Sequence, residues 1–171
     1  MTGLSVADQA LEASKAALVE QILLATGLVR IRALGLSMLP CIWPGDVLTI
    51  QSTRTADINI GDIVAVRQND RWVVHRVRQH SATQLIMRGD CVPENDPPIR
   101  VQDVIGKVVT VVRGSIEFAP GRNLSQVQEY LAWLLCHSNR FRSIMINFHR
   151  SRELRIRSEV RSKFKPTTAS S

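Results

Sequence analysis

Short runs of alternating apolar and polar residues fill the middle of this chain and strongly restrict the folds open to it. The runs occupy residues 28–34, 47–51, 62–68, 71–79, 84–88 and 104–113. The alternation is typical of strands with one buried face, and the short gaps between the runs fit turns better than crossover helices. We therefore predict a mainly β fold, with a coiled antiparallel or barrel-like sheet and no parallel β-α-β unit.

Two local signals refine this prediction. Asn69-Asp70 lies between two alternating runs and indicates a hairpin turn. Gly106 interrupts the last run, and a glycine inside a strand is typical of a bulge or a bend.

A helical pattern precedes the strands. Ser5 followed by Asp8 predicts a helix start, and Gly27 suits the residue after the last turn. Apolar residues recur at helical spacing and are expected to pack on the β domain; they are Leu11, Leu18, Ile22 and Ala25. This gives an N-terminal amphipathic helix over residues 1–27 and a β domain over residues 28–122.

The composition changes after Pro120-Gly121, where Asn123 or Ser125 predicts the cap of a second helix. Residues 123–171 carry 9 Lys and Arg against 3 Asp and Glu, whereas residues 1–122 carry 13 against 12. The apolar residues of this segment lie along one side; they are Leu131, Leu134, Leu135, Phe141, Met145 and Phe148. We predict a basic amphipathic helix followed by a disordered tail.

Three partners suit a basic amphipathic helix. It can dock on folded protein, either the β domain or a second copy of the chain, adsorb to an anionic membrane surface, or bind nucleic acid. Nucleic acid is the least favoured of the three.

The cysteines and the N-terminal residues indicate the cellular compartment in which the chain is expected. Cys41, Cys91 and Cys136 are odd in number and form no Cys-x-x-Cys pair, so neither a disulfide framework nor a zinc site is indicated, and we predict no metal or cofactor. The N-terminal residues do not read as an export signal, and the longest run without a charged residue, 33–45, is shorter than the roughly 20 apolar residues of a membrane span. The expected location is cytoplasmic, either free or peripheral at the inner membrane surface.

Two stretches contain candidate catalytic side chains. Gly35, Ser37, Met38 and Pro40, with Gly45-Asp46 following, form a turn that presents a serine hydroxyl to solvent. In residues 71–79 the alternation places His75 on the same face as Val73 and Val77. Read alone, the first stretch is also an ordinary turn and the histidine also an ordinary core residue.

Taken with other motifs, the two stretches resemble the signal peptidase I and SOS-repressor autopeptidase superfamily of serine peptidases. The resemblance rests on Gly35-x-Ser37-Met38-x-Pro40 with Gly45-Asp46, on Gly61-Asp62, on His75-Arg76-Val77, on 87–96 and on 104–109. It covers roughly residues 27–113. The histidine at the base position, where bacterial signal peptidases carry lysine, is similar to the endoplasmic-reticulum and archaeal type. Cys91 and Val92 depart from that type, which has asparagines there.

The resemblance implies a Ser-His-Asp peptidase. Ser37 would be the nucleophile, His75 the base and Asp96 the group that orients it, and backbone N–H groups near Gly35 and Ser37 would stabilise the oxyanion. Met38, Pro40 and Asp90 would support the site, with Asp90 as the competing candidate for the orienting carboxylate.

The implied function is that of a signal-peptidase-type endopeptidase that cuts a precursor or leader polypeptide after small residues. Two alternatives stay open: a self-cleaving repressor-type regulator and a non-catalytic binding module on the same fold.

Overall fold

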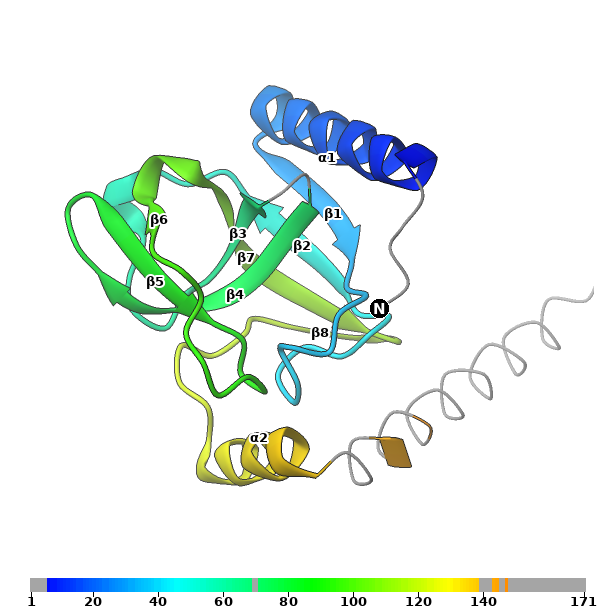
Figure 1. Cartoon of the computed structure of the whole chain (residues 1–171), viewed down its shortest axis with the longest axis vertical. Coiled ribbons are helices and arrows are strands. Elements are labelled where there is room, and N and C mark those ends of the chain that lie inside the picture. Colours follow the sequence, from blue (N-terminus) through cyan, green and yellow to red (C-terminus); the bar gives the residue numbers. More distant parts are fainter. Residues whose placement is uncertain (1–5, 69–70, 139–142, 145–146, 148–171) are drawn as a thin grey trace, which may run out of the picture.

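The chain folds around one antiparallel sheet, as the computed structural model shows for residues 6–68, 71–138, 143–144 and 147 (Figure 1). The strand order is β1-β2-β7-β3-β4-β5-β6, and β8 pairs with β7 outside this path. The strands are β1 (Leu28–Arg32), β2 (Val47–Gln51), β3 (Ile63–Gln68), β4 (Arg71–His80), β5 (Gln84–Arg88), β6 (Ile99–Arg100), β7 (Val104–Arg113) and β8 (Ile116–Phe118). The helices are α1 (Val6–Thr26) and α2 (Gln126–His137), with short 3-10 turns at Thr55–Asp57 and Val101–Asp103. The predicted mainly β fold with two helices is confirmed, and its sheet is not closed.

Strand β7 joins the two halves of the sheet. It pairs with β2 along one edge, and with β3 and β8 along the other. The register shifts between Ala65 and Val66 on β3, opposite Gly106 and Val104, so a bulge lies beside Gly106 as predicted. A Cβ at Gly106 would lie 2.6 Å from the Gln51 carbonyl oxygen, so only glycine lets β2 approach this closely.

Two turns of the same design begin β2 and β3. In each, an aspartate N–H donates to the carbonyl three residues earlier, and the aspartate carboxylate accepts from that residue's N–H; the pairs are Asp46 with Trp43 and Asp62 with Asn59. Gly45 and Gly61 occupy the third position with φ of 97° and 90°, a conformation that favours glycine. Cations from β7 then bind both carboxylates: Arg113 lies 2.7 Å from Asp46 and Lys107 lies 3.3 Å from Asp62.

Helix α1 packs through a different face from the predicted one. Leu23 is fully buried and Val19 packs beside it in a cluster that includes Val29, Met38 and Trp72. By contrast Leu18 and Ile22 are 57% and 40% exposed, and Ala25 is exposed too. The helix ends at Gly27 as predicted, with φ of 74°. Ser5 and the side chain of Leu11 lie outside the described residues.

Helix α2 lies at the opposite end of the molecule from α1 (Figure 1). Ser125, rather than Asn123, caps it: the Ser125 side chain accepts from Gln128 N, and the Gln128 side chain accepts from Ser125 N. Leu135 is fully buried against Leu39 and Cys91. The helix thus packs on the serine turn and on the segment that follows β5. Phe141, Met145 and Phe148 lie outside the described residues.

None of the helices within the described residues is long and apolar enough to cross a membrane.

Candidate active site

The loop between β1 and β2 carries Ser37, and its two ends are held together. Ala33 N donates to the Asp46 carbonyl at 2.8 Å, and Gly45 N donates to the Ala33 carbonyl at 2.8 Å. The carboxylate of Asp46, 1% exposed, accepts from Trp43 N and from the Arg113 guanidinium. The Gly45-Asp46 pair therefore closes the base of the loop.

Within the loop, Ser37 begins a tight turn. Ile42 N donates to the Met38 carbonyl at 2.9 Å, and the peptide bond before Pro40 is cis. Met38 is 4% exposed and Leu39 is fully buried, so the residues after Ser37 anchor the turn in the core.

Ser37 meets His75 from strand β4. The Ser37 Oγ lies 2.8 Å from His75 Nε2, a hydrogen-bond distance. His75 projects from the middle of β4, opposite Val64 of β3, and its side chain is 12% exposed. A paired strand on one side of His75 restricts the backbone that aims the imidazole at the serine.

The other imidazole nitrogen faces Asp96. His75 Nδ1 lies 2.5 Å from Asp96 Oδ2, and the Asp96 side chain is 17% exposed. Asp96 N donates to the Met87 carbonyl at 2.8 Å, which closes residues 87–96 into a loop. The three residues thus form a hydrogen-bonded chain, Ser37–His75–Asp96. Such a chain can remove a proton from a serine hydroxyl and stabilise the resulting imidazolium.

Asp90 lies apart from His75 and contacts arginines. Arg76 Nε and Nη2 each donate to one Asp90 oxygen at 2.8 Å, and Arg78 Nη2 reaches Asp90 Oδ1 at 3.3 Å. The Arg76 and Asp90 side chains are 1% and 0% exposed. Strand alternation alone assigns Arg76 to the polar face, yet it is buried.

Backbone carbonyls complete the surroundings of Arg76. Its Nη1 donates to the carbonyls of Gly61, Gly121 and Arg122 at 2.9, 2.6 and 3.0 Å. Burial disfavours the charged guanidinium, but the bonds to Asp90 outweigh it and raise the pKa of Arg76.

Two residues of the loop after β5 touch the serine directly, and sequence reasoning assigned neither contact. Cys91 N donates to the Ser37 carbonyl at 2.7 Å. A Cβ at Gly89 would lie 2.6 Å from that same carbonyl oxygen and 2.9 Å from Ser37 Cβ. Gly89 lies in the stretch 87–96 that carries the family resemblance, and its close approach to Ser37 is a tertiary contact with no local sequence signal.

The space around the serine suits an oxyanion. A Cβ at Gly35 would lie 3.9 Å from the Ser37 Oγ, an ordinary contact, so Gly35 leaves the hydroxyl open without being sterically required. Among the residues that the structure describes, none accepts a hydrogen bond from the Ser37 N–H. This N–H can therefore serve an oxyanion formed next to Ser37.

Two other groups that could act as a base or a nucleophile are the Lys107 amine and the Cys41 thiol. The Lys107 amine is paired with Asp62. Burial raises the pKa of the Cys41 thiol, which favours its protonated form. The described part of the chain holds no cluster of three or more potential metal ligands.

A comparison with family models agrees with this architecture. Residues 4–109 match the model described as Peptidase S24-like, a span that includes helix α1 as well as the loops of Ser37 and Asp96. No curated protein matches the chain. Because the match covers more than half of the sequence, this chain belongs to the Peptidase S24-like family.

Proposed function

We propose that this protein is a serine endopeptidase in which Ser37 is the nucleophile, His75 the general base and Asp96 the orienting carboxylate. The observation that carries the proposal is the chain of two short contacts, 2.8 Å from Ser37 Oγ to His75 Nε2 and 2.5 Å from His75 Nδ1 to Asp96 Oδ2. The family, which implies a serine-peptidase or self-cleaving repressor-type fold, supports it.

The proposed reaction uses the hydrogen-bonded side chains of Ser37, His75 and Asp96. His75 Nε2 takes the proton as Ser37 Oγ bonds to the carbonyl carbon of the substrate, and the Ser37 N–H stabilises the oxyanion. His75 then gives the proton to the leaving amine as the C–N bond breaks. His75 then takes a proton from water as the water attacks the acyl carbon, and returns it to Ser37 Oγ as the acyl–oxygen bond breaks, which frees the enzyme. Asp96 keeps the Nδ1 proton of His75 facing away from the serine throughout.

The finer part of the proposal is a signal-peptidase-type activity on a precursor or leader polypeptide. Its support is the histidine at position 75 and the exposed, partly apolar loop beside Ser37, in which Leu34 is 81% exposed. An extended substrate polypeptide can bury such a side chain.

Active-site labelling tests the peptidase. A fluorophosphonate is expected to modify the folded chain at Ser37, as located by mass spectrometry, and the Ser37→Ala variant to remain unmodified. In parallel, a peptide library should be cut by the wild type alone, with the preferred sites read from the new termini. A library left intact, together with an unlabelled Ser37, contradicts the proposal and favours a non-catalytic binding module.

A self-cleaving regulator is the second candidate, since the family implies this fold type as well. It predicts fragments of the chain itself, formed at a rate independent of protein concentration, and no cleavage of added peptides. The same mass spectra therefore separate the two candidates.

We also propose an anionic membrane surface as partner of the C-terminal segment. Val127, Tyr130 and Trp133 of α2 are 69%, 62% and 56% exposed, and the rings of Tyr130 and Trp133 stack at a centroid distance of 6.2 Å. All nine Lys and Arg residues of the segment 123–171 lie beyond residue 138. Exposed aromatic rings followed by basic residues suit an interface, where each basic residue contributes about 1 kcal/mol.

Removal of residues 139–171 is expected to leave the melting temperature nearly unchanged, because the buried clusters of the described part use residues 23–135. It should abolish co-sedimentation with vesicles that contain phosphatidylserine at low salt. Neutral vesicles are the control. If the complete chain does not sediment with the anionic vesicles, the membrane proposal fails.

A further inference from the structure

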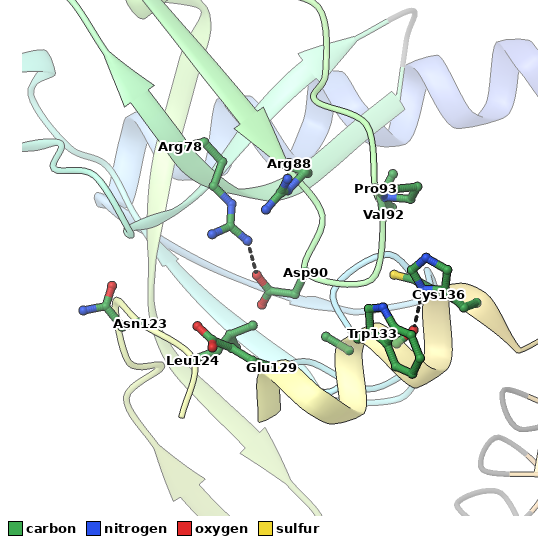
Figure 2. Close-up of a pocket in the computed structure, with 12 residues that line it drawn as sticks. Arg78, Arg88, Asp90, Val92, Pro93, Asn123, Leu124, Glu129, Trp133 and Cys136 are labelled. Carbon is green, nitrogen blue, oxygen red and sulfur yellow. Dashed lines mark hydrogen bonds and ion pairs between the residues drawn. The ribbon is translucent and has the colours of Figure 1, made fainter. Parts of the chain in front are cut away.

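A cavity separates α2 from the end of β4 and β5, outside the Ser37–His75 pair. Its volume is about 360 Å³, within the range of small-ligand sites. Figure 2 shows Arg78 and Arg88 on the sheet side and Glu129 and Trp133 on the α2 side, with Asp90 between them.

Arg78 is directed here by a bulge. Val77 pairs with Met87 and Gln79 pairs with Ile86, so Arg78 is an extra residue on β4. Bulges re-aim side chains and are enriched near functional sites. The Arg78 Nη2 reaches Asp90, but its Nε is buried and has no hydrogen-bond partner within the described part of the chain. A buried, unsatisfied guanidinium nitrogen at a cavity is an unusual feature that a bound acceptor would remove.

The charges at the cavity do not balance. Arg76 and Arg88 stand opposite each other on β4 and β5, and Arg78 is close to both. Asp90 is already engaged by Arg76 on both oxygens. Among the described residues, Arg88 has neither a hydrogen bond nor an ion pair through its side chain. Arg76, Arg78 and Arg88 therefore bring three positive charges against the two carboxylates of Asp90 and Glu129, an excess of one positive charge.

The electrostatics of Arg78 agree with this geometry. Burial and then the neighbouring Arg88 charge hold the pKa of Arg78 below its usual value. The negative charge of an anion placed between Arg78 and Arg88 would offset both effects and favour the charged guanidinium.

We propose that this cavity is an anion-binding site in which Arg78 and Arg88 hold an oxyanionic group, a carboxylate or a phosphate. Guanidinium groups recognise both chemistries through paired N–H donors. Val92, Pro93 and Trp133 give the cavity apolar walls, which suit a carboxylate carried on a peptide as well as a free ion. The occupant would touch the loop of residues 87–96, whose Cys91 binds the Ser37 carbonyl.

Inorganic phosphate is the first probe, added to the complete chain at constant ionic strength with sodium chloride as balance. The expected result is a saturable rise in melting temperature, about 5–10 °C when phosphate exceeds its Kd by 100-fold. Titration calorimetry gives the Kd itself.

Three variants test the location. Arg88→Gln should weaken phosphate binding at least tenfold, whereas Arg30→Gln, the same change at an exposed position on β1, should bind like the wild type. Glu129→Gln removes a carboxylate from the cavity and should strengthen binding severalfold, a gain that a merely unfolded variant cannot mimic. Unsaturable phosphate binding, or equal affinity in the wild type and Arg88→Gln, overturns the proposal.

A second arm identifies the source of the anion. A short blocked peptide with one glutamate should compete with phosphate, and the same peptide with glutamine should not, if the natural occupant is a carboxylate on a polypeptide. Arg88-dependent phosphate binding without competition by the peptide assigns the site to a free phosphate group. Phosphate binding and peptide competition are both measured without cleavage, so their outcome does not depend on peptidase activity.

Discussion

Alanine at Ser37 or at His75 is expected to lower the rate of peptide-bond cleavage by about 10⁶-fold and to leave the fold intact. Ser37→Ala removes the attacking oxygen, and His75→Ala removes the base 2.8 Å away from it. Because the two residues act as a unit, the double variant should be no slower than either single one. The measurements are the initial cleavage rate of a peptide identified from the library and the melting temperature of each variant.

The contact between His75 and Asp96 predicts a smaller but still large effect for Asp96→Asn. The asparagine amide would favour the wrong tautomer of His75, so turnover should fall by about 10⁴-fold with little change in stability. Near-normal turnover in Asp96→Asn, beside an inactive but stably folded Asp90→Asn, would show that the carboxylate roles are reversed.

Asp90→Asn should lower the free energy of unfolding by about 3–5 kcal/mol. Its effect is therefore on stability and not on catalysis alone. The substitution leaves the guanidinium of Arg76, 1% exposed, without its carboxylate, and removes a contact of Arg78. Urea denaturation followed by fluorescence measures the loss as a lower midpoint with an unchanged slope.

The matched control is Asp57→Asn. Asp57 also binds an arginine through a short contact, 2.9 Å from Arg54, but the two side chains are 49% and 87% exposed. Solvent screens that pair, so its loss should leave the urea midpoint unchanged. If Asp90→Asn unfolds at the same urea concentration as the Asp57→Asn control, the buried ion pair does not stabilise this fold.

The strands could be predicted because their signal is local. Alternation over residues 47–51, 84–88 and 104–113 gave the bounds of β2, β5 and β7. The strands β6 and β8 span only 99–100 and 116–118, too short for alternation to appear, and exist through pairing with β5 and β7.

The face of α1 could not be predicted for a different reason. Apolar residues lie on several sides of this helix, including Leu18, Val19, Ile22, Leu23 and Leu24. Helical spacing alone does not choose between overlapping faces. The choice falls to tertiary contacts, such as those of Leu23 in the cluster with Val29 and Trp72.

In the site, the residue types could be read from motifs, but the contacts between motifs could not. The resemblance favoured Asp96 over Asp90, and the structure places Asp96 against His75. The burial of Arg76 depends on Asp90 and on carbonyls at 61, 121 and 122, which are distant in sequence. The close approach of Gly89 to Ser37 is likewise a tertiary contact between residues distant in sequence.

The strand order has a consequence for the timing of synthesis. The loop of Ser37 belongs to the hairpin of β1 and β2, whereas His75 belongs to β4, and in the sheet these parts are joined only through β7. A ribosome makes residues 104–113 after both. Until β7 has emerged, the nascent chain lacks the strand that pairs with both β2 and β3, so no strand pairing fixes the serine hairpin against the histidine hairpin. The order of strands thus delays the assembly of the site until most of the β domain has been made.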